Sequence, residues 1–111
     1  MVSAEIVSSV RRFFRALAAE GLGVSFGVIF GSQARGTADK WSDIDLVVVC
    51  PRFDQGIRRE DVDRLWTTAA MTDCRIEPIP CGEREWHEDD SRAIIEIARR
   101  EGATITPADT E

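Results

Sequence analysis

The stretch GSQARGTADKWSDIDLVVV, residues 31–49, joins two apolar runs through a loop of small and polar residues. The runs, VSFGVIF (24–30) and IDLVVVC (44–50), are rich in β-branched and aromatic types, which favours two buried strands. About a dozen residues separate them, too few for a crossover helix with its turns. We therefore predict two antiparallel neighbouring strands, with room for one short helical turn after Ser32.

The rest of the chain predicts helices around this strand pair. Apolar side chains recur at helical spacing in three segments, and CRIEPIP is bounded like a strand, with prolines that favour a sheet edge. The predicted elements are helices over 3–20, around Val62 to Ala70 and from Trp86 to a stop at Gly102, with further strands over 74–80 and 103–106. This order predicts an α+β (mixed α/β) fold, a small mixed sheet covered by helices, in a single domain over residues 1–111.

Composition limits the classes of partner that the protein can bind. The net charge of −6 and pI of about 4.8 argue against a long nucleic acid as partner, but not against a nucleotide whose charge metal ions offset. No apolar run approaches the roughly 20 residues of a membrane span, so we expect a cytoplasmic protein without a membrane partner. The cysteines Cys50, Cys74 and Cys81 lack paired spacing and suggest reduced, buried thiols, and Trp66 and Trp86 are expected in the core.

Two carboxylates begin the second strand. Alternate residues of a strand project from one face, so Asp43 and Asp45 should lie side by side, about 6.5 to 7 Å apart along the chain. Such a pair repels itself unless a cation bridges it, and carboxylate oxygens suit Mg²⁺. A pair of solvated acids at a strand start is the alternative interpretation.

The residues before the aspartates suggest an anion site. Gly31 and Ser32 directly follow a strand and can open a helical turn whose N–H groups and hydroxyl accept a phosphate. Arg35 can offer a fork of donors to phosphate oxygens, and Lys40 a second charge. Plain turn chemistry for the glycines and a solvated charge for the arginine remain open. The candidate nucleotide-binding residues are Gly31, Ser32, Arg35, Gly36 and Ser42.

In an antiparallel pair, the end of the first strand and the start of the second meet at one edge of the sheet. A metal-bound nucleotide placed there would need a third carboxylate from an adjoining strand. Glu77 is the acidic residue within the third predicted strand. Trp41, in the same loop, can stack on a base or pack against the protein.

The letters GS, ten intervening residues and DID resemble the motif of the DNA polymerase β-like nucleotidyltransferase superfamily. The run GSQARGTADKWSDIDLVVV is most similar to minimal nucleotidyltransferases of the MntA type, which are encoded with HEPN-domain partners, and the closing RREGATI fits more weakly. The resemblance implies that Gly31 and Ser32 hold the triphosphate of ATP. It also implies that Asp43, Asp45 and Glu77 form the catalytic and metal-binding set for two Mg²⁺ ions. Glu77 departs from the family pattern, in which this position is more often Asp.

The resemblance implies transfer of AMP from ATP to a hydroxyl acceptor on a HEPN toxin, which would make this chain an antitoxin. We expect the acceptor site to come from that partner, because little of this chain follows the last predicted helix. The sequence contains no tyrosine, so tyrosine self-modification is excluded. A homo-oligomer stays open, and the alternative function is a weakly active or inactive partner-binding, regulatory subunit of the same fold.

Overall fold

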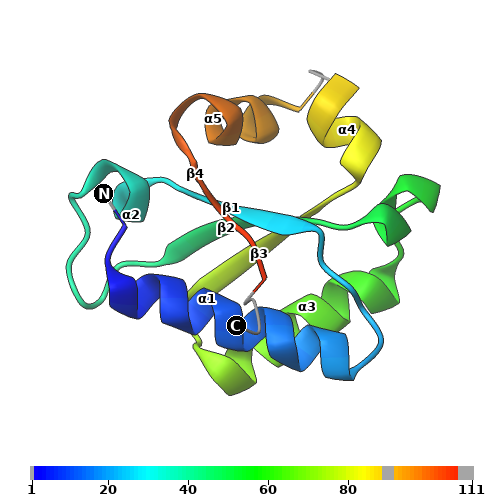
Figure 1. Ribbon diagram of the computed structural model, residues 1–111, viewed down its shortest axis with the longest axis horizontal. Helices are drawn as coiled ribbons and strands as arrows, with labels where there is room; N and C mark the ends of the chain where they lie inside the picture. Colours follow the sequence, from blue (N-terminus) through cyan, green and yellow to red (C-terminus); the bar gives the residue numbers. More distant parts are fainter. Residues whose placement is uncertain (1, 89–91, 108–111) are drawn as a thin grey trace.

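The fold is built on a mixed sheet with the strand order β3-β2-β1-β4, seen in the computed structural model in Figure 1. The structure describes residues 2–88 and 92–107. The strands are β1 (Phe26–Phe30), β2 (Ile44–Val49), β3 (Ile76–Cys81) and β4 (Ala103–Ile105). Strand β1 pairs antiparallel with β2 and β4, whereas β3 runs parallel to β2. The predicted antiparallel pair and mixed sheet are confirmed, and the two prolines of β3 lie on an edge strand, where a missing N–H donor is tolerated.

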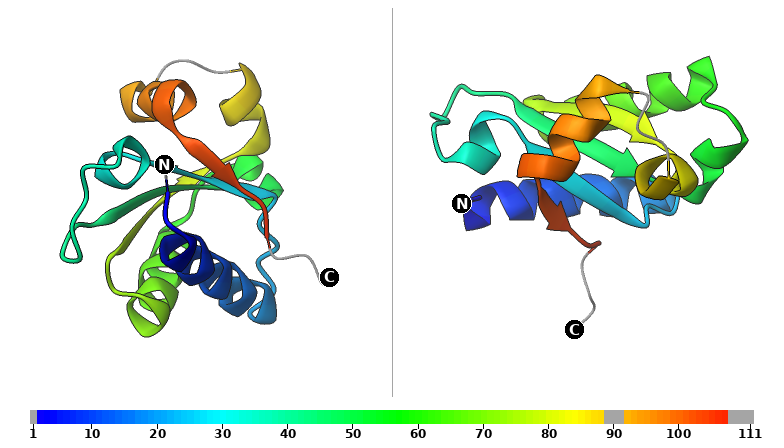
Figure 2. Two further views of the ribbon diagram at one scale, coloured as in Figure 1. Left: turned by 60° about the vertical axis from the view of Figure 1, so that its left-hand side comes forward. Right: turned by 90° about the horizontal axis from the view of Figure 1, so that it is seen from above.

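Helices cover both faces of the sheet, as the two views of Figure 2 show. On one face lie α1 (Ala4–Ala19) and α3 (Arg59–Thr72), and on the other α4 (Glu83–Glu88) and α5 (Ala93–Glu101). The short helix α2 (Ser32–Arg35) follows β1, and the 3₁₀ helix η1 (Pro51–Gln55) follows β2. Helix α2 is the helical turn that the sequence predicts after Ser32.

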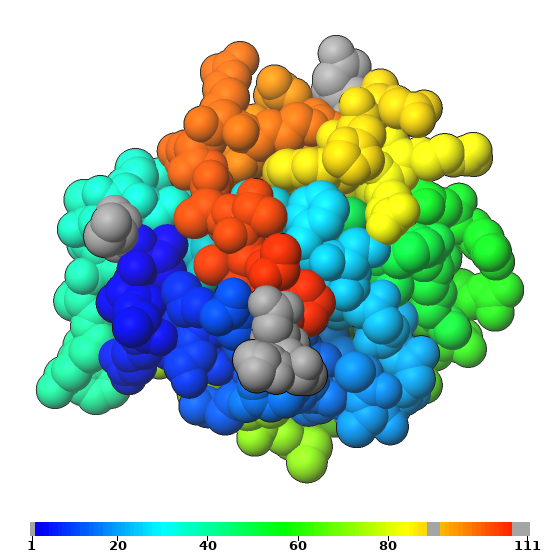
Figure 3. Space-filling view, viewed as in Figure 1, coloured from blue at the N-terminus to red at the C-terminus, as the bar shows by residue number. Residues whose placement is uncertain are grey.

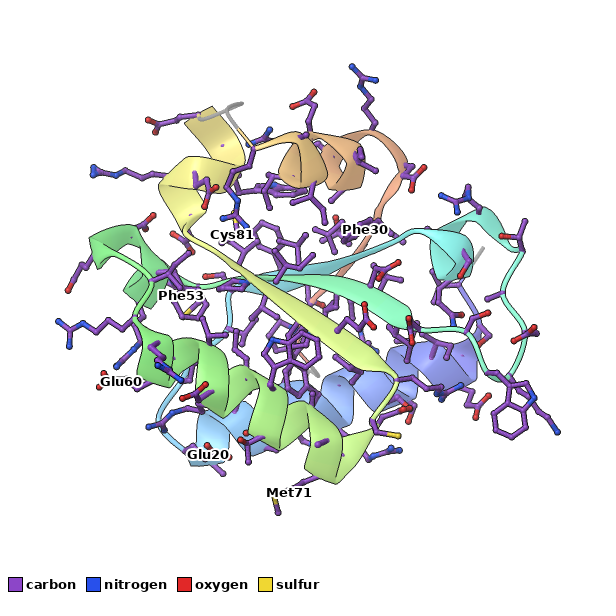
Figure 4. All side chains as sticks on the ribbon, turned by 180° about the vertical axis from the view of Figure 1, so that it is seen from behind. Glu20, Phe30, Phe53, Glu60, Met71 and Cys81 are labelled. Carbon is purple, nitrogen blue, oxygen red and sulfur yellow. The ribbon has the colours of Figure 1, made fainter. Side chains whose placement is uncertain are left out.

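Strand β2 contributes to two separate cores because its side chains alternate between the faces. Ile44, Leu46 and Val48 join the cluster under α1 and α3. Val47 and Val49 join a smaller cluster under α5. Figure 4 labels two further members of the smaller cluster, Phe30 and Cys81, on the α5 side of the sheet.

Three expectations about individual elements are wrong. The last predicted helix is two helices, α4 and α5, and residues 89–91 between them lie outside the described part. Trp66 is 47% exposed because its neighbour Leu65 takes the inward position of α3. Cys74 is exposed in the turn before β3, while Cys50 and Cys81 are buried as expected. Trp86 is half-buried and packs edge-on against Phe26.

Strand β4 closes the sheet beside α1. Figure 3 shows it at the surface of the molecule, as befits an edge strand, with the N-terminal helix next to it. Arg11 donates from Nε to the carbonyl oxygen of Thr106, at 3.1 Å, and so links α1 to the residue after β4. None of the helices in residues 2–88 and 92–107 is long and apolar enough to cross a membrane.

Candidate functional site

The glycine turn after β1 and the aspartates of β2 meet at one end of the sheet. Phe30 stands opposite Asp45 in the antiparallel register, and Asp45 stands opposite Glu77 in the parallel one. Gly31 follows Phe30, and a Cβ placed on it would overlap Oδ2 of Asp45. The structure thus brings together Gly31, Asp45 and Glu77, as the predicted strand pairing requires. The roles of these residues stay predictions.

Two conditions require glycine at position 31. Its backbone is in the left-handed half of conformational space, with φ of +75° and ψ of −149°, where residues with a Cβ are strained. The second condition is the missing space beside Asp45. The carbonyl oxygen of Gly31 accepts hydrogen bonds from the N–H groups of Ala34 and Arg35, at 3.1 and 3.0 Å, and begins α2. Gly36, with φ of +79°, ends this helix, so its turn chemistry is confirmed.

Asp45 and Glu77 are harder to ionise than carboxylates in water, because they are partly buried and close to other negative charges. Burial and the charge of Asp43 raise the pKa of Asp45, while the nearby charge of Arg35 lowers it in part. Burial, a hydrogen bond with Asp43 and the charges of both aspartates raise the pKa of Glu77. The edge therefore favours a bound proton or a cation, because either one relieves the repulsion.

The carboxylate oxygens of Asp43, Asp45 and Glu77 are ligands of the kind that Mg²⁺ prefers. In this structure, however, the three side chains are not arranged to coordinate an ion together. Among residues 2–88 and 92–107, no group of three or more Asp, Glu, His or Cys side chains is arranged to hold a metal ion. Asp43 is exposed and Asp45 and Glu77 are partly exposed, so their side chains have room to rotate. Holding Mg²⁺ in near-octahedral geometry requires such a rotation.

The loop between α2 and β2 is tied together by its own side chains. The hydroxyl of Ser42 accepts from the N–H of Asp39 at 3.0 Å and donates to the carboxylate of Asp39 at 3.2 Å. The N–H of Trp41 donates to the same carboxylate at 2.9 Å. Trp41 is 79% exposed, so the packing role considered for it is wrong and stacking stays open. The Nζ atom of Lys40 lies 5.0 Å from the centre of the indole ring.

Sequence reasoning missed Gln33. This side chain is buried, and its amide nitrogen lies 3.5 Å from the carbonyl oxygen of Ser42 and 3.4 Å from that of Asp43. Long though they are, these contacts hold the residues before β2 against α2. In the sequence, Gln33 cannot be told from a solvent-exposed polar residue of the loop. Only the structure shows that it is buried.

A second missed residue is Glu101, the last residue of α5. Its Oε2 atom accepts from the N–H of Gly31 and from Nη1 of Arg35, both at 3.1 Å. The one available signal is its position directly before a helix-ending glycine in RREGATI, and that signal does not name a partner.

A surface cleft of about 340 Å³ lies beside the loop, between the start of α1 and the turn before β3. Its lining includes Ser3, Gln33, Lys40 and Arg75, and does not include the three carboxylates. The guanidinium of Arg75 is held by Asp73, whose pKa that ion pair lowers to about 2. The cleft is therefore distinct from the carboxylate edge, and Lys40 lies on the cleft side of the loop.

A glycine turn, a strand that begins with paired aspartates and an adjoining acidic strand define the class of fold that nucleotidyltransferases have. A protein from Sulfolobus solfataricus, proposed to be a nucleotidyltransferase, has a crystal structure similar to this one with a TM-score of 0.61. The similarity covers 90% of this chain and 78% of that chain at 17% sequence identity, and at that identity it shows a shared fold. No curated protein matches the sequence.

The sequence itself gives the family. The model of the nucleotidyltransferase domain family matches residues 9–100, and the chain belongs to that family, within the DNA polymerase β-like superfamily. The matched range includes the glycine turn, both aspartates and Glu77, while Glu101 lies one residue beyond it.

Proposed function

We propose that this domain is a Mg²⁺-dependent nucleotidyltransferase that transfers AMP from ATP to a hydroxyl group on a partner protein. The observation that carries the proposal is the meeting of Gly31, Asp45 and Glu77 at one end of the sheet in a chain of this family.

In the proposed reaction, the acceptor oxygen forms a bond to the α-phosphorus as the bond to the β-phosphate breaks, releasing pyrophosphate. Asp43 and Asp45, with Glu77, would hold two Mg²⁺ ions, which stabilise the negative charge of the triphosphate and of the departing pyrophosphate. Glu77 would share the second ion, which would lower the pKa of the acceptor hydroxyl, or would itself accept the hydroxyl proton. Gly31 and Ser32 would orient the phosphates for in-line attack.

The acceptor is proposed from the resemblance to minimal nucleotidyltransferases of the MntA type. Their HEPN-domain partners suggest a toxin whose hydroxyl-bearing side chain receives AMP, with this chain as the antitoxin. Because the chain has no tyrosine, a tyrosine acceptor must lie on the partner. Co-expression with the neighbouring gene product, followed by mass spectrometry, should show the added mass of AMP on the partner. An unmodified partner in the presence of ATP and Mg²⁺ contradicts this acceptor.

Labelling with ATP carrying a label on its α-phosphate tests the reaction. Wild-type protein should label the acceptor in the presence of Mg²⁺, and Asp43→Asn should abolish the labelling. Asp63→Asn is the matched control, because it removes the same charge from an exposed position on α3. Equal labelling by wild type and Asp43→Asn would sink the proposal.

A regulatory subunit without turnover is the second candidate, favoured by two observations. Glu77 replaces the usual Asp, and the described residues contain no ready-made cluster of metal ligands. Calorimetry separates the two functions, because the enzyme should bind ATP only with Mg²⁺, whereas the subunit should bind its partner without either. Glu77→Asp should raise turnover if the longer side chain limits an enzyme, and should change nothing in a subunit that only binds.

A further inference from the structure

The carboxylate of Glu101 connects α5 to the glycine turn, seventy positions earlier in the chain. One oxygen, Oε2, accepts from the backbone N–H of Gly31 and from the guanidinium of Arg35. The Glu101 side chain is 30% exposed and that of Arg35 is 54% exposed. The hydrogen bond from Gly31 is partly buried, whereas the ion pair with Arg35 is exposed and contributes little to stability by itself.

The backbone fixes the position of Glu101 from both sides. The residue ends α5, and Gly102 follows it where a Cβ would overlap the side chain of Val28 and the carbonyl oxygen of Ala98. Directly afterwards, Ala103 pairs with Ile29 of β1. The backbone of Glu101 is therefore fixed by the end of α5 on one side and by the pairing of β4 with β1 on the other.

Glu101 is the shared acceptor of two donors near the glycine turn, the N–H of Gly31 and the guanidinium of Arg35. The start of α2 already holds the carbonyl oxygen of Gly31, and Glu101 adds a partner for its N–H. The Arg35 side chain is long, and it loses rotamer entropy when it is held in one position. Arg35 is the last residue of α2, the short helix that begins at the glycine turn, so the ion pair with Glu101 keeps its charge beside that turn. Releasing Arg35 would remove a positive charge from beside the edge where the triphosphate is proposed to bind.

We propose that Glu101 is a positioning residue for nucleotide binding, which fixes the amide of Gly31 and the guanidinium of Arg35 before the triphosphate arrives. This inference rests on the proposed function. Glu101 itself does not touch the nucleotide. It acts through the other two residues, so its loss should weaken binding of the nucleoside triphosphate more than it slows the chemical step.

Kinetics of Glu101→Ala and Glu101→Gln test the proposal. Glu101→Ala should raise KM for ATP about tenfold, in the range typical of residues that orient a ligand-binding group, with kcat changed less than threefold. Glu101→Gln should recover most of the loss, because its amide oxygen still accepts from Gly31 and Arg35. The matched control is Glu96→Ala, which removes a carboxylate from the same helix and its contact with Arg99 at 2.8 Å, and should leave KM unchanged.

Several results would overturn the inference. One is an unchanged KM in folded Glu101→Ala, and another is tighter ATP binding in either variant, which would make Glu101 a competitor of the phosphate. A wild-type protein that binds no ATP with Mg²⁺ overturns the proposed function instead. In that case NMR still tests whether Glu101 holds the two groups, since Glu101→Ala, unlike Glu96→Ala, should shift the Gly31 amide and the Arg35 guanidinium signals. Unshifted signals refute it.

Discussion

Strand β2 contributes side chains to both faces of the sheet, and the two faces differ in how completely they bury those side chains. Ile44, Leu46 and Val48 are fully buried and belong to a cluster of sixteen buried residues under α1 and α3, counted over the described chain. The cluster on the other face, which includes Val47, has seven such residues, and Asp45 stands partly exposed at its end. The smaller core leaves the carboxylate edge uncovered.

This difference predicts that alternate residues of β2 have different roles, with those on one face serving stability and the carboxylates on the other face serving chemistry. A strand that alternates between faces can place apolar side chains in a closed core and carboxylates at an open edge within a few residues. Substitutions on neighbouring positions of β2 should then have different consequences, which the following predictions test.

The largest effect is expected for Asp45→Asn. Loss of this carboxylate should reduce transfer of AMP about 100-fold or more, a size typical of removing one preorganised electrostatic group at a reacting phosphate. Stability to urea at pH 7 should not fall, because the variant removes a charge that its surroundings disfavour. Asp63→Asn is again the control. Retained transfer by Asp45→Asn contradicts the assignment of this face to chemistry.

The next largest effect is expected on stability, in the variants Val48→Ala and Val47→Ala. Both valines are fully buried and lie side by side in sequence on opposite faces. Each truncation should lower the free energy of unfolding by about 2 to 3 kcal/mol, measured by urea denaturation, because it deletes two methyl groups and leaves a cavity. Only Val47→Ala should also alter KM for ATP, since it loosens the face that carries Asp45. Equal effects on KM would remove the distinction between the faces.

A smaller effect is expected for Gly31→Ala against Gly21→Ala. Both glycines have positive φ, +75° and +91°, so backbone strain alone should cost each variant about 1 to 3 kcal/mol of stability, and the overlap with Asp45 should add to the cost at position 31. The added Cβ meets Asp45 at position 31 and nothing within 4 Å at position 21. Calorimetry should therefore show weakened ATP binding in Gly31→Ala alone. Normal binding by this variant would show that the close approach to Asp45 is not needed.

The smallest effect is the pH dependence of stability without metal. Because the folded protein raises the pKa of Asp45 above 3.8, its contribution to stability is fully present below that pH and is lost as the pH rises through the folded value. In EDTA, the stability of Asp45→Asn relative to wild type should thus increase as the pH is raised from about 4 toward neutrality. A constant difference across urea titrations at several pH values would contradict the raised pKa.

Much of the fold could be predicted because its signals are local. The apolar face of α1, with Phe13 and Leu17, follows from helical spacing alone, and the short connection between β1 and β2 leaves an antiparallel pair as the simplest solution. The paired prolines placed β3 at an edge. The break between α4 and α5 was missed because Trp86 and Ile94 continue an apolar pattern that sequence alone cannot divide.

Burial of single side chains was harder to predict. Trp66 lies on a helical face that counts as apolar in the sequence, yet Leu65 and Ala69 of α3 join the buried cluster and Trp66 does not. Cys74 looked like part of a strand but falls in the turn before it. The burial of such side chains depends on how closely neighbouring helices and strands pack, and the periodicity of the sequence does not contain that information. The single domain over residues 1–111 and the HEPN partner stay predictions.

The sequence by itself determined that the glycine turn and Asp45 meet at one edge of the sheet. Ten residues between Gly31-Ser32 and Asp43 allow one helical turn and a loop, and the alternation of β2 then sets Asp45 on the face that Gly31 approaches. Only the tertiary structure decided that Glu101 holds the glycine turn. No local pattern joins residues seventy positions apart, because that contact depends on where α5 ends after it has packed on the sheet.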